Sequence, residues 1–391
     1  MGQLDAATLT QGYPADVLRT VHLRHDDLAS LSDLSALMRP DEMELIVLFV
    51  SSMADFDAVL KRVAGCCEGT HVIGCSTAGE ISPDGYAEGE IVAVGFPRDM
   101  FRAKIHLIPD LDDIPSQHLI DRMIQSRGEL EAERPDWRYE FNFVVIDGLS
   151  KREDALTSGL AMGLGPVPLF GGSAGDGTDF EETFVLYDGE AYRNAAVLAQ
   201  FRTRCPVRVF KTDHLIPSDT RMVVTGADPA RRTVHEINAE PAAREYARIL
   251  GKDPEQLTTF TFAAHPVVVR IGGQHHVRAI QRVAENGELV FFSAIDEGLV
   301  LTLAEPENMI DHLRRELGGL SDERRPANIL GCDCLLRRME AQENQMTHEI
   351  SALLREHRVI GFSTYGEQYN SMHVNQTLTG VAIYPPEEDA P

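Results

Sequence analysis

The sequence has no run of 18 apolar residues, so it lacks a segment that could cross a lipid bilayer as a helix. Its first fourteen residues also lack the basic stretch and following apolar stretch that mark a secretory signal peptide. No low-complexity linker divides the chain, and no familiar output domain is visible. We therefore expect a cytoplasmic protein that does not bind membranes and has to act on a separate output protein.

Positive charge is scarce in this sequence. Lys and Arg number 36 against 61 Asp and Glu among 391 residues, which gives a formal net charge of −25. Such a field repels phosphate backbones and anionic lipid, so nucleic-acid and membrane-surface roles are excluded. Hydrophobic residues make up 43% and charged residues 25%, the proportions of an ordinary globular protein.

Only six cysteines are present, at positions 66, 67, 75, 205, 332 and 334. A disulfide framework is unexpected in a long intracellular chain, so we expect reduced thiols. A zinc site would require the Cys66–Cys67 pair and the Cys332-x-Cys334 pair to meet in space. Together the two pairs would then supply four sulfur ligands.

The sequence does contain one short phrase three times. An apolar strand end is followed by a glycine, a hydroxyl residue, a second glycine and a carboxylate, at 72–80, 169–176 and 359–367. Glycine is needed where the backbone approaches another group closely or adopts positive φ. We therefore predict a ligand-binding set at these loops: Gly74, Ser76, Thr77, Glu80, Gly172, Ser173, Asp176, Ser363, Thr364, Tyr365, Glu367 and Asn375.

The surrounding pattern predicts an α/β fold. Buried strands at 45–50, 143–146 and 328–330 are each followed by a helical pattern and then by the glycine phrase, which indicates internal duplication. We predict pseudo-repeated β-α-β-β units in mixed sheets that face each other, with helices outside. The expected divisions are an extension at 1–40, an N-terminal module of two units at 41–206, and a C-terminal module at 207–391 that ends in the third unit.

These residues resemble the FIST sensory family, named for F-box and intracellular signal transduction proteins. GCSTAGEIS at 74–82 and LFGGSAGDG at 169–177 resemble its N-terminal module, and INAEPAAREYARILG at 237–251 and VIGFSTYGEQYNSMHVNQT at 359–377 resemble its C-terminal module. The resemblance implies a small-ligand sensor. Stand-alone members include nitric-oxide-sensing haem proteins (the NosP group), which act on a histidine kinase or a cyclic-di-GMP enzyme in trans.

The resemblance thus implies haem with nitric oxide as the leading ligand. Haem needs an axial ligand, usually a histidine. His373, beside the third loop, is the first candidate, followed by His265 and His235, and Arg270 or Arg278 would meet the propionates. Self-association of the chain is left open.

Two alternatives use the loops differently. The repeated carboxylates and hydroxyls suit an amino acid or a similar metabolite bound without haem. Gly171 to Gly175 also match the G-x-S-x-G pattern of a hydrolase, with Ser173 as nucleophile. The residues after Ser173 favour a turn over the helix that a nucleophile elbow requires, so we expect a binding protein rather than an enzyme. The simplest reading of any single loop residue is that it satisfies turn backbone.

Overall fold

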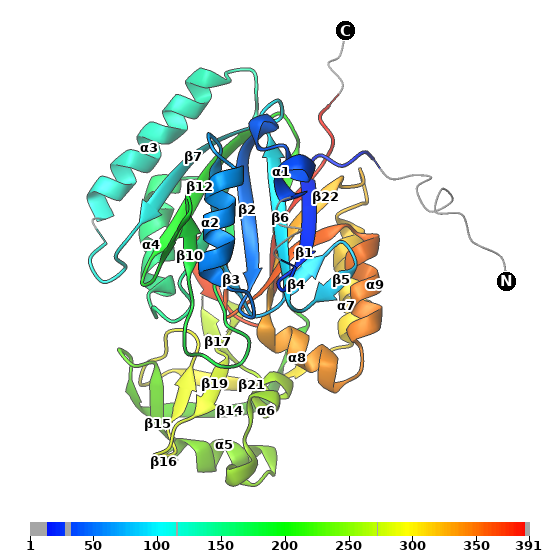
Figure 1. Cartoon of the computed structure of the whole chain (residues 1–391). Helices are drawn as coiled ribbons and strands as arrows, with labels where there is room; N and C mark the ends of the chain where they lie inside the picture. Colours follow the sequence, from blue (N-terminus) through cyan, green and yellow to red (C-terminus); the bar gives the residue numbers. More distant parts are fainter. Residues whose placement is uncertain (1–13, 28–32, 115, 272, 388–391) are drawn as a thin grey trace, which may run out of the picture.

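The computed structural model describes residues 14–27, 33–114, 116–271 and 273–387, and three consecutive units build most of it (Figure 1). The first unit consists of β1 (Arg19–Arg24), α1 (Asp33–Met38), the 3-10 helix η3 (Pro40–Glu42), β2 (Met43–Ser51), α2 (Phe56–Cys66), β3 (His71–Thr77), β4 (Glu80–Ser82), β5 (Gly85–Ala87) and β6 (Glu90–Pro97). The predicted N-terminal extension therefore contains an edge strand and a helix of this unit.

The second unit repeats this order. It consists of β7 (Phe101–Ile108), α3 (Ser116–Glu133), β8 (Tyr139–Ile146), α4 (Glu153–Leu164), β9 (Leu169–Ser173), β10 (Val185–Tyr187), β11 (Glu190–Tyr192) and β12 (Ala196–Thr203). In both units the two strands that flank the second helix pair in parallel, and the last strand runs antiparallel beside the first of them. The same local pattern therefore folds into the same unit twice.

The third unit is interrupted by an inserted domain. The unit itself consists of β13 (Val207–Thr212), α7 (Met309–Gly319), β22 (Asn328–Cys334), α8 (Leu335–Glu343), α9 (Thr347–Glu356), β23 (Val359–Thr364), β24 (Glu367–Tyr369), β25 (Met372–Val374) and β26 (Leu378–Ile383). The sequence predicted one helix at 335–357. Two form instead, because Gln345 between them has φ of 59°, in the left-handed region that interrupts a helix.

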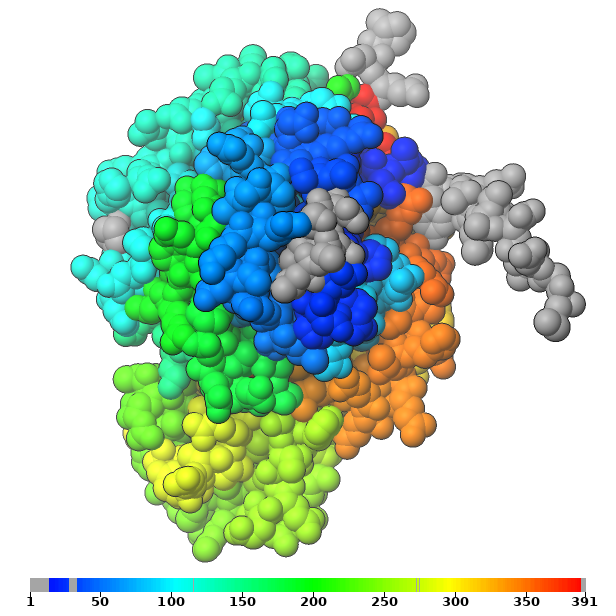
Figure 2. All heavy atoms as spheres, viewed as in Figure 1, coloured from blue at the N-terminus to red at the C-terminus, as the bar shows by residue number. Residues whose placement is uncertain are grey.

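The inserted domain, residues 215–306, has its own eight-stranded sheet. It consists of β14 (Leu215–Asp228), β15 (Thr233–Ile237), β16 (Glu240–Pro241), α5 (Ala242–Leu250), the 3-10 helix η4 (Pro254–Gln256), α6 (Thr259–Ala264), β17 (Val267–Ile271), β18 (Gln274–Val277), β19 (Ile280–Val283), β20 (Leu289–Phe291) and β21 (Val300–Pro306). Figure 2 shows it in lime and yellow as a lobe at the bottom of the molecule.

The short hairpin of each unit pairs with the sheet of a neighbouring unit. The three main sheets have the strand orders β1-β6-β2-β3-β10-β11, β7-β12-β8-β9-β24-β25 and β13-β26-β22-β23-β4-β5. The hairpin of unit 2 thus completes the sheet of unit 1, that of unit 3 completes the sheet of unit 2, and that of unit 1 completes the sheet of unit 3. The exchange closes a ring, so no unit has a complete sheet of its own.

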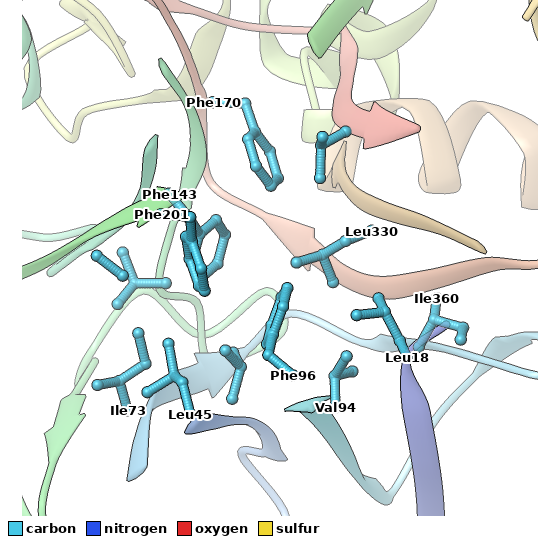
Figure 3. Close-up of a cluster of buried hydrophobic side chains, with 14 of the residues drawn as sticks. Leu18, Leu45, Ile73, Val94, Phe96, Phe143, Phe170, Phe201, Leu330 and Ile360 are labelled. Atoms are coloured by element: carbon cyan, nitrogen blue, oxygen red, sulfur yellow. The ribbon is translucent and has the colours of Figure 1, made fainter. Parts of the chain in front are cut away.

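The inner faces of the three sheets share one hydrophobic core. Side chains such as Phe49, Phe143, Phe170, Leu330 and Phe362 are fully buried in it. Figure 3 shows that residues of all three sheets point toward a common centre. Because side chains alternate along a strand, the intervening residues face outward and pack under helices: α2 on sheet 1, α3 and α4 on sheet 2, and α7 and α9 on sheet 3. The predicted α/β architecture of facing mixed sheets with outer helices is confirmed, with three sheets around the core.

Candidate functional site

The three glycine loops meet where β3, β9 and β23 end. The amide two residues after each loop serine donates to the carbonyl of the serine in a neighbouring loop: Ala78 to Ser363 at 3.0 Å, Gly175 to Ser76 at 3.1 Å, and Tyr365 to Ser173 at 3.3 Å. The same bond thus occurs three times in a cycle. The repeated loop chemistry therefore first serves to lock the three units together.

The first glycine of each phrase serves close strand packing. A Cβ at Gly74, Gly171 or Gly361 would overlap a backbone carbonyl oxygen of the adjacent parallel strand. A Cβ at Gly172 would meet the side chains of Thr364 and Phe362. These glycines are required by contacts within the fold, and such contacts leave no room for a ligand at the same backbone.

The repeated carboxylates are also engaged internally. Thr77 donates a short hydrogen bond to Glu80, and Thr364 donates one to Glu367. The second oxygen of Glu80 accepts the amide of Glu90 at 3.0 Å, and that of Glu367 accepts the amide of Thr377 at 3.1 Å. Each carboxyl group therefore ties the start of an exchanged hairpin to the strand that follows.

Burial raises the pKa of both groups, to about 7 for Glu80 and about 8 for Glu367, although the threonine hydrogen bonds oppose that rise. Asp176 is used differently. It accepts the amides of Phe180, Glu181 and Glu182 at 2.7–2.9 Å, together with the hydroxyl of Tyr365. The three carboxylates are thus structural acceptors in this state.

Ser173 does not have the geometry of a catalytic serine. Its hydroxyl is buried and accepts a hydrogen bond from Gln368 Nε2 at 3.1 Å, and Gln368 in turn contacts Nδ1 of His373 at 3.2 Å. An amide cannot act as a general base, and the chain after Ser173 runs into a loop instead of the helix of a nucleophile elbow. The arrangement favours recognition over hydrolysis.

Beside these loops, the inserted domain closes over the three-sheet body along a polar seam. Ser293 donates to Asn375 at 2.8 Å, Gln376 donates to the carbonyl of Ala263 at 2.9 Å, and the amide of Ala294 donates to Asp154 at 3.1 Å. Arg232 also pairs with Glu153 at 2.7 Å. Each of these bonds joins the inserted domain to the body, so the seam is a specific interface.

Aromatic rings line one part of the seam. The centroids of Phe180, Phe292 and Tyr365 lie 4.8–5.9 Å apart, within the range of favourable ring pairs. Phe180 comes from the loop after the second glycine phrase, Tyr365 from the third phrase, and Phe292 from the inserted domain. The seam therefore offers apolar surface directly beside its polar groups.

Several polar atoms of the seam are buried without a partner. Among the described residues, eleven buried side-chain nitrogen or oxygen atoms lack one. Four of them belong to this region: Nε2 of His373, Oε1 of Gln368, Oε1 of Gln376 and Nε of Arg278. A buried polar group without a hydrogen bond costs about 1–3 kcal/mol. A ligand that bonded to these four atoms would remove that cost, so the seam is the candidate ligand site.

Arg278 and His373 are the two titratable groups of the seam that have an unpartnered nitrogen. Arg278 forms no ion pair with any residue that the structure describes, and burial lowers its pKa. Burial is also the main cause of the lowered pKa of His373, on which the charges of Glu153 and Asp154 act in the opposite direction. His373 is 3% exposed, so its ring is neutral and able to donate or accept.

The other two predicted haem ligands lie away from these groups. His265 ends α6 and is half-buried, and its carbonyl accepts the hydroxyl of Tyr246. His235 is exposed on β15. For haem, Nε2 of His373 is a suitable free donor, but amide side chains and the backbone of Gly366 surround the ring. The groups against this side of the His373 ring are polar, whereas haem requires an apolar pocket around its axial ligand.

The cysteine pairs do not meet. Cys66 and Cys67 lie at the end of the outer helix α2, whereas Cys332 is in the shared core. Within the described residues there is no group of three or more potential metal ligands. The hypothetical four-sulfur zinc site is therefore wrong for this structure.

Sequence reasoning missed a buried charge network at the end of β22. Arg337 is fully buried, donates to Asp333 at 2.7 Å and contacts Nδ1 of His214 at 2.8 Å. Nε2 of His214 contacts Glu340 at 3.0 Å, and Tyr86 of an exchanged hairpin donates to Asp333. The signal was a lone Asp inside an apolar strand, between Cys332 and Cys334. These groups satisfy one another, so the network holds the fold.

The architecture defines a class of protein: a triplicated α/β body with exchanged hairpins, whose third unit carries a lobe that closes over the loop centre. Of the helices that the structure describes, none combines the length and apolar character needed to span a bilayer. Residues 44–240 match the FIST N domain and residues 242–370 match the FIST C domain.

This chain belongs to the FIST family. It is also similar to the uncharacterized protein MJ1623 of Methanocaldococcus jannaschii, at 23% identity over 389 residues that span 86% of this chain and 73% of that protein. The two matched domains meet at residues 240–242, inside the inserted domain. FIST domains are sensory, so the chain has a small-ligand sensing role in signalling.

Proposed function

We propose that this protein senses a small metabolite that carries a carboxylate, such as an amino acid, and binds it in the seam between the inserted domain and the three-sheet body. The observation that carries the proposal is Arg278, a half-buried guanidinium whose Nε is buried without a partner and which forms no ion pair among the described residues. A cation that is partly removed from water is costly unless an anion compensates it. A ligand carboxylate supplies that anion, and a guanidinium binds it with two parallel hydrogen bonds.

The neighbouring groups suit the rest of such a ligand. Nε2 of His373 and Oε1 of Gln368 are buried and free to bond. Glu153 and Asp154 pair with Arg232, and their negative charge still acts on His373, on the side where a ligand ammonium would be placed. Together these groups match an amino acid better than a dicarboxylate, because Arg232 already pairs with Glu153 and Asp154, which leaves Arg278 to bind one ligand carboxylate.

The closed seam links binding to signalling. A ligand bound between Arg278 and His373 would contact both parts, so the bonds from Ser293, Ala294 and Arg232 across the seam would have to adjust. A ligand that binds more tightly to one position of the inserted domain increases the population of molecules in that position. A separate output protein reads that position. The family resemblance makes a histidine kinase or a cyclic-di-GMP enzyme the first candidate for it.

Haem with nitric oxide is the second candidate ligand. It is favoured by the free Nε2 of His373 and by Arg278, which would meet a propionate. When bound, haem would supply an iron site for the gas. His373 would hold the iron, provided that the seam opens on the side of its ring.

A thermal-shift screen with the amino acids, followed by calorimetry, tests the proposal. We expect one of them to raise the melting temperature of the unmodified chain and to lose most of its affinity for Arg278→Met. Arg282→Met, which removes an exposed arginine of the same domain, is the matched control and should bind normally. Equal binding by both variants would refute the assignment.

Titration with hemin tests haem, the second candidate ligand. A saturable Soret band at one haem per chain that disappears in His373→Ala but persists in His118→Ala, an exposed histidine on α3, would replace the metabolite with haem. Failure of both ligand classes to bind would end the seam proposal.

A further inference from the structure

The end of helix α2 brings two thiols together. Cys66 is its last residue and Cys67 its C-cap, and the two sulfur atoms lie 3.5 Å apart. Successive residues of a regular helix point about 100° apart, so adjacent thiols normally diverge. Here Cys67 leaves the helix with φ of −116° and ψ of 25°, which brings its side chain back toward Cys66.

Cys66 also has the environment of a reactive thiol. It is half-exposed, while the five other cysteines are buried. The hydrogen bond between the two thiols and the charge of Arg62, one turn earlier, lower the pKa of Cys66 to about 7. Burial instead raises the pKa of Cys75, Cys332 and Cys334. The thiolate is the nucleophile in disulfide chemistry, so Cys66 reacts first.

We propose that Cys66 and Cys67 form a reversible dithiol–disulfide pair that is oxidised by low-molecular-weight disulfides. The Cys66 thiolate attacks one sulfur of the small disulfide, forms a mixed disulfide and releases one thiolate. Cys67 then loses its proton and attacks Cys66, so the Cys66–Cys67 bond forms and the second small thiol leaves. Two protein thiols are oxidised while one small disulfide is reduced to two thiols.

Ring closure changes the end of α2. The sulfurs must approach from 3.5 Å to about 2.05 Å, inside a ring that contains the peptide bond between the two residues. The amide of Cys67, which belongs to that peptide bond, donates to the carbonyl of Val63 at 2.9 Å. The carbonyl of Cys67 accepts the amide of Thr70 at 3.1 Å. Thr70 in turn bonds to Pro40. Oxidation therefore loosens the last turn of α2 and its link to the start of sheet 1.

This site is independent of the seam, so it would give the protein a second input. Helix α2 covers sheet 1 through Val59 and Val63, on the outer side of the molecule. The inference does not rest on the identity of the ligand, and either proposal can fail without the other.

Full-length protein treated with oxidised glutathione, denatured and alkylated, tests the site by mass spectrometry. We expect the six free thiols to fall to four, with two hydrogens lost from the peptide that contains residues 66 and 67, and full recovery with dithiothreitol. Amide hydrogen exchange in the last turn of α2 should rise on oxidation. Wild-type protein that keeps six thiols, or that stops at a stable glutathione adduct, would overturn the proposal.

Two matched variants assign the roles. Cys67→Ser keeps a hydroxyl donor beside Cys66, so it should retain one glutathione per chain as a mixed disulfide. Cys66→Ser should form neither product. Cys205→Ser, at a buried cysteine away from α2, should behave like the unmodified chain. Disulfide formation in Cys66→Ser, or its loss in Cys205→Ser, would contradict the assignment.

Discussion

Replacement of Glu367 by Gln should stabilise the protein at alkaline pH and change its stability little at pH 5. Burial raises the pKa of Glu367 from 4.5 to about 8, so the folded state keeps a proton that the unfolded chain has lost. The contribution of Glu367 to the free energy of unfolding is therefore greatest below pH 4.5 and falls as the pH rises toward 8. At about 1.4 kcal/mol per pH unit, the loss between pH 5 and pH 8 is on the order of 4 kcal/mol.

The glutamine side chain of the Glu367→Gln variant would remain neutral over this whole range. Its carbonyl oxygen can accept the two hydrogen bonds from Thr377, and its amide can donate to the hydroxyl of Thr364. The variant therefore reproduces the protonated state of the glutamate. The difference between variant and unmodified chain isolates this group from all others that titrate.

Urea denaturation at pH 5, 6.5 and 8 measures that difference. We expect it to grow steadily with pH in favour of the variant. Glu80→Gln should show the same trend with its rise completed near pH 7, since the pKa of Glu80 is raised to about 7. Glu349→Gln, on the exposed side of α9, is the control and should show no trend. A variant that is equally destabilised at every pH would refute the reasoning.

Three other outcomes follow from the packing. Gly171→Ala should lower the free energy of unfolding, measured by urea denaturation, by about 3 kcal/mol, because the new Cβ would overlap a neighbouring carbonyl. The control Gly128→Ala, on an open helix face, should raise it by up to about 1 kcal/mol. Asp333→Asn should cost about 3–5 kcal/mol by the same assay, since it leaves a buried arginine unpaired. Fragments 1–206 and 207–391 should each lack cooperative unfolding by circular dichroism and regain it when mixed, because each needs a hairpin from the other; independent folding of either would contradict the ring of exchanged hairpins.

The repeated unit could be predicted from the sequence because its signals are local. The run Leu45 to Val50, the helix that follows it and the glycine phrase are readable from apolar periodicity alone. The exchange of hairpins could not be predicted. Strands β4, β10 and β24 have only three residues each and follow the same phrase, so any of them could complete any of the three sheets. Only the closed ring of loops decides between these pairings.

The candidate site shows a different limit of prediction from sequence. Residue type predicted ligand-binding loops, but Ser76, Glu80 and Glu367 bond within the fold, which is the simpler interpretation of such residues. Gln368 was missed and Arg278 was noted only as a propionate contact. Each of these two has one buried polar atom without a partner, Oε1 of Gln368 and Nε of Arg278, a property of the assembled structure that no residue pattern displays.

The inserted domain makes one of the three otherwise equivalent units different from the other two. The three loops are nearly equivalent by construction, and equivalent loops at one centre bond to one another rather than to a ligand. An insertion in only one unit breaks that equivalence, because Ser293 bonds to Asn375 beside the third loop, and Phe292 packs against Phe180 after the second loop and Tyr365 of the third. In the first unit, the space beside Gly79 is filled by Arg338 of the body itself. In the third, the corresponding space beside Gly366 is filled by His373 and Asn375, and Asn375 accepts a hydrogen bond from Ser293 of the inserted domain. The proposed ligand site therefore lies at the loop that the insertion makes different from its counterpart in the first unit.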